Sequence, residues 1–191
     1  MILTEEIMKD AGCCDPGVNR YFNDGDNKEY EASELLELAI MREDFGDAGY
    51  AISKLMTNLQ RVEWAVYCAR EVLSIFEEKF PNDFRSRKAI EAAERYLSNP
   101  TASAARAADA AYAAGAADAA RATGAAYAAY AADAAAYAAD VAADAARAAT
   151  AVDAAFAAAD AAYAASRAAA NNNPIYPSLL RKGLEILLTG D

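Results

Sequence analysis

The sequence predicts an all-α protein: a multi-helix bundle with closely packed, Ala-rich antiparallel helices. Apolar residues recur at helical spacing along the 191-residue chain, and no segment shows the alternation typical of a half-buried strand. Residues 101–170 contain 44 Ala in 70 positions, and Ala has the highest intrinsic helix propensity. We therefore expect more than roughly two thirds of the residues to be helical, with no β-sheet.

Residues 1–57 are predicted to form an acidic N-terminal helical module. Thr4 is expected to cap a first short helix, Asp15 to begin a second and Ser33 to cap a third. The stretch Phe45-Gly46-Asp47 is expected to interrupt the chain before a fourth helix.

Residues 58–170 are predicted to form a helical bundle that includes the Ala-rich repeats. Its clearest helix covers about residues 58–80, because Val62, Val66, Ala69, Leu73, Phe76 and Phe80 are spaced alternately four and three positions apart. A further helix is expected over residues 84–97. The Ala-rich stretch is expected to form two or three antiparallel helices, with breaks at Gly115 and at Thr123-Gly124, and with Thr150 as a further candidate break.

Residues 171–191 are predicted to contribute a C-terminal helix that packs on the bundle. The run Asn171-Asn172-Asn173-Pro174 should end the preceding helix. The following helix, over about residues 177–188, carries Leu180, Leu184 and Leu187 on one face.

The composition argues against an enzyme and against a cofactor or metal site. The chain contains no His, which is the commonest general base and metal ligand. Its three Cys residues, Cys13, Cys14 and Cys68, lack the spacing of a zinc site or of a disulfide framework. Charged residues recur through the Ala-rich stretch, which argues against a membrane span. These features favour a cytoplasmic protein.

The net charge of −11 is concentrated near the N-terminus. Residues 1–50 contain 4 Lys or Arg and 13 Asp or Glu, a net charge of −9. An acidic surface repels nucleic acid and attracts basic proteins. The first candidate partner-binding surface comprises Asp24, Asp26, Glu29, Glu31, Glu34 and Tyr30, with Tyr21, Phe22 and Tyr50 as further aromatic anchors. The alternative is an ordinary solvated acidic loop and helix start.

A second candidate surface lies in the repeats, where larger residues interrupt the Ala at regular intervals. Tyr130 and Tyr137 are seven positions apart, as are Asp133 and Asp140, and Asp144 follows one helical turn later. Tyr is a favoured interface anchor and carboxylates suit a basic partner. The alternative is structural, with Tyr filling gaps between Ala faces. A homodimer through residues 126–165 is also left open.

Part of the chain resembles a known family. The resemblance rests on WAVYCA (64–69), on VLSIFEEKFPNDFRSRKAIEAAERYL (72–97) and on the AADAA and AAYAA units that follow. These segments resemble the alanine-rich immunity proteins of bacterial polymorphic toxin systems, over about residues 60–170. The resemblance implies a helical, non-enzymatic protein that neutralises a partner by binding it, and it assigns no binding residues.

The N-terminal segment ILTEEIMKDAGCCDPGVNRYF (2–22) resembles a short leader module at the front of diverse phage and prophage proteins. This second resemblance implies a phage-borne copy that acts on a host defence system.

Together these observations predict a non-enzymatic inhibitor that binds and neutralises a macromolecular partner. The partner is expected to be a basic, nuclease-like or nucleic-acid-binding protein, with no direct contact to nucleic acid or membrane. The inhibitor would be an immunity protein against a bacterial toxin or a phage anti-defence, anti-CRISPR-like protein. The alternative is a structural, oligomer-forming helical protein without an inhibitory target.

Overall fold

The structure is a computed structural model that describes residues 1–22, 29–101, 130, 132–134, 136–138, 140, 158–165, 167 and 175–190. Most of these residues are helical, which confirms the predicted all-α class. The elements follow the chain in the order β1 (Ile2–Thr4), α1 (Glu5–Asp10), α2 (Asp15–Phe22), β2 (Glu29–Glu31), α3 (Ala32–Met41), α4 (Phe45–Leu55), α5 (Asn58–Lys79), α6 (Arg85–Ser98) and α11 (Tyr176–Thr189).

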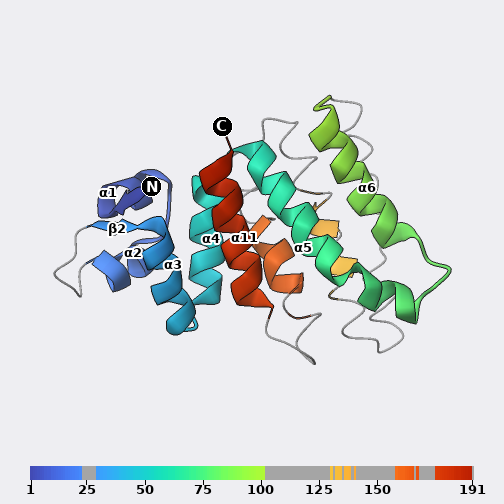
Figure 1. Cartoon of the computed structure of the whole chain (residues 1–191), viewed down its shortest axis with the longest axis horizontal. Helices are drawn as coiled ribbons and strands as arrows, with labels where there is room; N and C mark the ends of the chain where they lie inside the picture. The colour runs from blue at the N-terminus through green and yellow to red at the C-terminus, as the bar shows by residue number, and fades with distance from the viewer. Residues whose placement is uncertain are drawn as a thin grey trace.

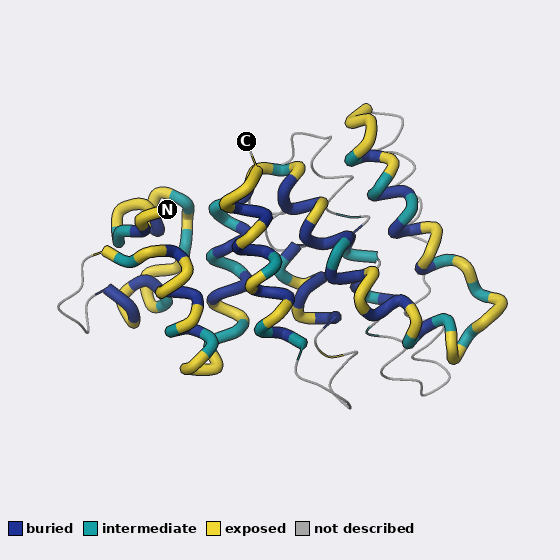
Figure 2. The backbone as a smooth tube through the Cα atoms, viewed as in Figure 1, coloured by how far each residue is buried: buried dark blue, intermediate teal, exposed yellow. Residues whose placement is uncertain are grey.

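The C-terminal helix α11 lies between helices from the first half of the chain. It packs on α4 and α5 and also contacts α3, while α6 packs on the other side of α5 (Figure 1). The buried sides of these helices face one another, and a single hydrophobic core runs from Leu3 to Leu187 (Figure 2). We refer to α4, α5 and α11 as the centre, and to β1, α1, α2 and β2 as the cap.

Helix α5 confirms the prediction for residues 58–80. Thr57 caps its start, since Thr57 Oγ1 accepts a hydrogen bond from the Gln60 amide and Gln60 Oε1 accepts one from the Thr57 amide at 2.8 Å. The predicted apolar stripe is buried from Val62 to Phe76, and Phe80 packs at its edge. The stripe therefore binds α5 to its neighbours along most of its length.

The centre is held by close contacts between α5 and α11. Trp64 is fully buried, and its indole N–H donates to the backbone oxygen of Leu179 at 2.9 Å. Gly183 lets α11 approach the indole, because a Cβ built on Gly183 would lie 2.7 Å from Trp64 Cε2. Gln60 also reaches α11 and donates to the Ile186 oxygen at 3.0 Å. These contacts join residues that are far apart in the sequence.

Two predicted helix starts in the N-terminal region are confirmed. Thr4 Oγ1 accepts from the Ile7 amide at 3.2 Å, and α2 begins at Asp15. The prediction that Ser33 caps the third helix is wrong, because Glu31 is the N-cap and Ser33 lies in the first turn. Strand β2 leads directly into α3, so the helix begins at Ala32, before the predicted cap residue.

The predicted break at residues 45–47 is also wrong, because Phe45 begins α4. The chain turns at residues 42–44 instead, where Glu43 has a φ of 59°. Backbone amides in this turn donate to carbonyls at the end of α3, such as Asp44 to Ala39 at 3.0 Å. The turn is stabilised by these bonds, and Gly46 serves as an ordinary helical residue.

A two-stranded antiparallel sheet contradicts the expectation that the protein has no β-sheet. Strand β1 pairs with β2 through Ile2 with Glu31, Leu3 with Tyr30 and Thr4 with Glu29. Each strand has three residues, which is too short to show the alternation that marks a strand in the sequence. The pairing therefore became visible only in the tertiary structure.

The described part of the Ala-rich stretch joins the core. Its buried residues are Ala132, Ala134, Ala138, Ala158, Ala161, Ala162, Ala164 and Ala165. Tyr130 and Tyr137 are partly buried and pack against the same core. The predicted breaks at Gly115, at Thr123-Gly124 and at Thr150 lie outside the described residues. Among the described helices, none combines the length and apolar character needed to cross a bilayer.

Candidate functional site

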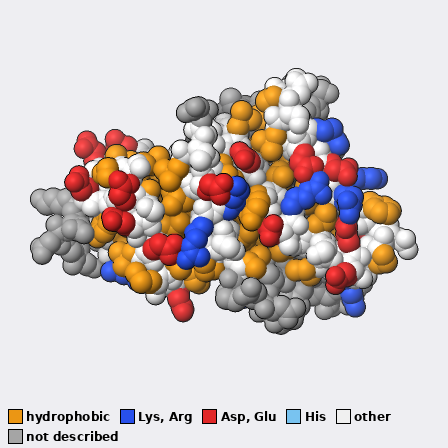
Figure 3. Space-filling model, in the orientation of Figure 1, with side chains coloured by type: hydrophobic (Ala, Val, Ile, Leu, Met, Phe, Trp, Pro, Cys, Tyr) orange, Lys and Arg blue, Asp and Glu red, His pale blue; other side chains and the backbone are white. Residues whose placement is uncertain are grey.

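The first candidate surface lies on the cap and the start of α3, at one end of the molecule. Asp and Glu side chains gather over this end (Figure 3). Glu29, Glu31 and Glu34 are exposed, as the acidic-surface prediction requires. Asp24 and Asp26 lie outside the described residues. The structure thus places three of the five predicted carboxylates on one short stretch of exposed chain.

Several acidic residues near this end are already paired. Glu5 binds Lys9 at 2.6 Å, and Glu37 forms two bonds with Arg181 of α11, at 2.7 and 2.8 Å. The Glu31 carboxylate lies 3.3 Å from the Met1 amino group. Glu34 accepts a hydrogen bond from the Glu31 amide at 3.4 Å, which leaves its charge uncompensated.

The remaining carboxylates define what we call the acidic surface. These residues are exposed and form no ion pair with another described residue: Glu6, Asp10, Asp15, Glu29, Glu34 and Glu43. None of them bonds to a cation in the part of the chain that the structure describes, although Lys9 attracts Asp15 at longer range. The acidic surface therefore retains a strong negative field that an external basic group can meet.

The aromatic residues predicted as anchors take different roles. Tyr21 and Phe22 are buried, so the prediction that they contribute to a surface is wrong. They fold inward because α2 turns this face toward the core. Tyr30 is half-buried, with its ring edge-on to Phe22 at 5.5 Å and its hydroxyl donating to the Tyr21 oxygen at 3.1 Å. Tyr50 is half-buried beside the Lys54 ammonium.

The second candidate surface lies in a different part of the molecule. The described residues 130–140 run behind α5, whereas β2 lies at the far end (Figure 1). Tyr130 lies 5.3 Å beneath the Arg167 guanidinium, and Tyr137 is partly buried against the core. Asp133 and Asp140 are partly exposed, and Asp144 lies outside the described residues. The structure does not bring the two candidate surfaces together.

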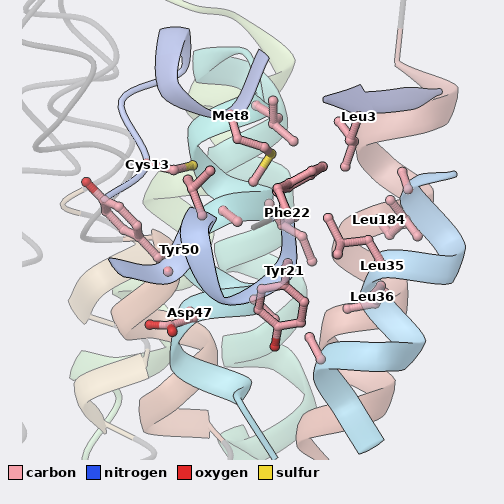
Figure 4. Close-up of a pocket in the computed structure, with 18 of the residues that line it drawn as sticks. Leu3, Met8, Cys13, Tyr21, Phe22, Leu35, Leu36, Asp47, Tyr50 and Leu184 are labelled. Carbon is pink, nitrogen blue, oxygen red and sulfur yellow. The ribbon is translucent and has the colours of Figure 1, made fainter. Parts of the chain in front are cut away.

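A feature that sequence reasoning missed is an apolar pocket of about 80 Å³ between the cap and the helices beneath it (Figure 4). The cap contributes Met8, Val18 and Phe22, while α3, α4 and α11 contribute residues such as Leu36 and Leu184. Exposed Cys14 and Asp47 also border the pocket. No local sequence signal marks it, because its walls come from separate elements.

Beside the pocket, polar contacts join the cap to the turn before α4 and the first turn of α4. Arg20 Nη1 lies 3.0 Å from Asp44 Oδ1 and 2.9 Å from Asp47 Oδ2. The Tyr21 hydroxyl donates to Asp44 Oδ2 at 2.6 Å. We call Arg20, Tyr21, Asp44 and Asp47 the latch. The Arg42 guanidinium covers the Tyr21 ring at 5.0 Å from its centre.

Contacts within the latch shift the pKa values of Asp44 and Tyr21. The Tyr21 hydroxyl bond, followed by the Arg20 charge, lowers the pKa of Asp44 below its ordinary value. Burial and the bond to Asp44 raise the pKa of Tyr21. Both shifts favour the ionised Asp44 and the neutral Tyr21, which is the arrangement that the hydrogen bond needs.

Two of the three thiols, those of Cys13 and Cys68, are poorly suited to nucleophilic chemistry. Burial raises the pKa of half-buried Cys13 to about 11 and also raises that of fully buried Cys68. Within the described ranges, no three His, Cys, Asp or Glu side chains come together as a metal site.

Comparison with known proteins relates the chain to a protein family. No curated protein and no solved structure matches the chain. A family model described as "Family of unknown function (DUF6931)" matches residues 35–187. The match covers most of the chain and includes α4, α5 and all but the last two residues of α11, whereas the cap precedes it. The chain therefore belongs to the DUF6931 family.

Proposed function

We propose that this protein is a non-enzymatic inhibitor that binds and neutralises a basic protein, of the nuclease-like or nucleic-acid-binding kind. The observation that supports the proposal is the acidic surface, whose carboxylates form no ion pair with other described residues. A basic groove built to hold phosphates attracts such a surface. The inhibitor itself avoids nucleic acid, because like charges repel.

Charge on this surface would act mainly on encounter. Complementary potentials raise association rates and select against wrong partners, and this attraction weakens as salt screens it over about 10 Å at 0.1 M. Affinity then requires desolvated contacts near the carboxylates. Tyr30 supports this role in part, because it is half-buried between the exposed Glu29 and Glu31.

Two kinds of target fit the same chemistry. The resemblance of residues 60–170 to alanine-rich immunity proteins supports a bacterial toxin as the target. The resemblance of residues 2–22 to a phage leader module supports a host defence complex, with an anti-CRISPR-like role. In either case we propose that the target contact is a basic surface that binds nucleic acid, which the acidic surface would occupy.

A non-catalytic role is part of the proposal. The chain has no His, and burial disfavours the thiolates of Cys13 and Cys68. Neutralisation by binding needs only a stable fold and a complementary surface.

The test is a pair of charge-matched variants. One combines Glu6→Gln, Glu29→Gln and Glu34→Gln on the acidic surface. The control combines Glu63→Gln, Glu71→Gln and Glu78→Gln, which are exposed on α5 and form no ion pair with described residues. Each variant changes the net charge equally, so only position differs. Gln at position 34 can still accept the hydrogen bond from the Glu31 amide.

Both variants and the native protein are used to capture partners from the native host, and the association rate with the captured protein is measured between low and high salt. We expect one basic, nucleic-acid-binding partner whose association slows severalfold in the acidic-surface variant and hardly at all in the control. Equal effects of both variants would contradict the assigned surface. Recovery of this chain alone would favour the structural, self-assembling alternative.

A further inference from the structure

We infer that the cap opens and closes as one unit on α3, α4 and α11, while the centre stays folded. This inference concerns the chain's own conformational equilibrium and does not depend on the proposed inhibitory function. It rests on the internal contacts of the cap, on the packing beneath it and on the position of the latch.

The cap has its own internal structure. Strand β1 pairs with β2, and α1 packs on both β1 and α2. Phe22 and Tyr30 make an edge-to-face ring contact inside the cap. The helices α1 and α2 have more of their backbone near each other than near α3, α4 or α11. The cap can therefore leave its neighbours without losing most of its own backbone contacts.

The seam beneath the cap is incompletely packed. The pocket of about 80 Å³ lies between the apolar residues of the cap and those of α3, α4 and α11. Side chains around a void lose contacts on one side, which weakens the attachment of the cap. In the centre, by contrast, a single added Cβ at Gly183 would overlap Trp64.

The latch fastens the cap at one edge. Arg20 and Tyr21 both belong to α2, and their partners Asp44 and Asp47 belong to the turn before α4 and to its first turn. On the opposite edge, β2 continues directly into α3, with the Ala32 amide bonded to the Met1 oxygen at 2.9 Å. A polar fastening opposite a continuous chain is the arrangement of a lid with a hinge at the β2–α3 junction.

The match to the family begins within α3, so the cap lies outside the matched residues. Opening would expose the apolar side of α3 and α4, including Ala39, which is buried at the pocket. A thiol placed at this position reports directly on the cap, and the pocket has room for its sulfur atom.

The experiment uses the full chain with Cys13→Ser, Cys14→Ser and Ala39→Cys. The native Cys68, fully buried in α5, is the reference in the same molecule. The thiol introduced at position 39, which we call the seam thiol, and the Cys68 thiol are both labelled with uncharged 4,4′-dithiodipyridine. Peptide mass spectrometry follows the labelling of each site. Each rate is divided by that of the same thiol in the urea-unfolded chain, which removes differences in intrinsic reactivity.

We expect the seam thiol to react at least about 100-fold faster than Cys68 without denaturant, and with a weaker dependence on urea, because cap opening exposes less surface than global unfolding. The latch variant Arg20→Gln with Tyr21→Phe should speed labelling of the seam thiol by about tenfold and leave Cys68 within about twofold. The control Arg70→Gln removes an ion pair of the same type between α5 and α6 and should leave the seam thiol unchanged.

Equal rates and equal urea dependence at the two sites would overturn the inference, since the cap would then open only with the whole protein. The inference would also be overturned if the seam thiol were labelled fast and the latch variant did not change its labelling rate. That result would mean that the reagent reaches the thiol through the pocket while the cap stays in place.

Discussion

The centre and the seam beneath the cap are both apolar, yet they are held together differently. In the centre, Gly183 brings α11 against Trp64, and the indole N–H bonds to the Leu179 backbone. At the seam a pocket remains, and the latch supplies charged hydrogen bonds at one edge. The centre thus relies on close packing, whereas the seam combines buried apolar side chains with a pocket and a partly exposed set of charged hydrogen bonds.

The difference has an energetic consequence. A close-packed region responds strongly to added volume, and a region with a void responds weakly or favourably. The following four predictions test this contrast, and Trp64, the only Trp in the chain, provides a fluorescence signal from the centre.

The largest effect is expected for Gly183→Val. The Cβ would lie 2.7 Å from Trp64 Cε2, so α11 must move away from α5. We expect the free energy of unfolding to fall by about 3 kcal/mol in urea titrations monitored by Trp64 fluorescence. The matched control is Gly46→Ala in α4, where nothing lies within 4 Å of the added Cβ, and it should stabilise by about 0.5 kcal/mol. Similar losses in both variants would show that packing against Trp64 is not the cause.

A smaller loss is expected for Arg61→Met, where α4 meets α5. Buried Arg61 donates to the Ser53 oxygen at 2.7 Å and to the Lys54 oxygen at 3.3 Å, near the end of α4. Met fills similar space but leaves these carbonyls unpaired, so the free energy of unfolding should fall by about 2 kcal/mol. Arg61→Lys should lose less, because one ammonium can still donate to a carbonyl. Urea titration of both variants checks the order, and a fully stable Arg61→Met protein would refute this role.

Acid should loosen the seam through Asp44. Its pKa is lowered in the folded protein, so its stabilising contribution is complete above its ordinary pKa, near 4, and is lost as pH falls through the folded value. The groups that face it are Arg20, Tyr21, Arg42 and Asp47. Labelling of the seam thiol should therefore rise between pH 6 and pH 3, by roughly tenfold.

Asp44→Asn provides the control for the acid effect. It should show faster labelling near neutral pH and a flatter dependence below it. Glu37 and Asp83, whose pKa values are also lowered, are present in both proteins, so the difference isolates Asp44. If the labelling rate of the seam thiol depended on pH in the same way in both proteins, protonation of Asp44 would not be the cause of the loosening.

The smallest effect is expected from filling the pocket. Ala51 borders it from α4 and is only partly buried, so Ala51→Leu adds apolar volume without forcing α4 to move. We expect the free energy of unfolding to rise by about 0.5 kcal/mol or less. Labelling of the seam thiol should become slower by roughly twofold to fivefold. Ala93→Leu, at a fully buried position in α6, should instead destabilise the protein. If Ala51→Leu lowered the free energy of unfolding as much as Ala93→Leu does, the pocket would not have room for the larger side chain.

The long helices could be predicted because their signals are local and repeated. The apolar stripe from Val62 to Phe80 predicted the bounds of α5 to within a residue, and the Leu residues of α11 marked its buried face. The structure of the cap region (β1, α1, α2 and β2) and the start of α3 were harder to predict. Three-residue strands and a helix N-cap at Glu31 carry no comparable repetition in the sequence. The choice of Ser33 and of residues 45–47 followed general residue preferences, which the β2–α3 connection and the Glu43 turn overrode.

The candidate site was predicted only in part. Glu29, Glu31 and Glu34 are exposed because a short strand and a helix start face solvent there, as the charge density suggested. Tyr21 and Phe22 looked equally suited to a surface, but their placement depended on which side of α2 meets the core. The pairing of Glu37 with Arg181 joins residues of α3 and α11 and had no sequence signal.

The sequence by itself determined that the protein is helical, that it lacks His and that its negative charge is concentrated in the first fifty residues. These properties depend on composition and on spacing within one helix, which are local. Only the tertiary structure decided that Gly183 meets Trp64, that Asp44 meets Arg20 and Tyr21, and that a pocket lies beneath the cap. Such contacts join segments through the packing of the whole chain, so no single segment encodes them.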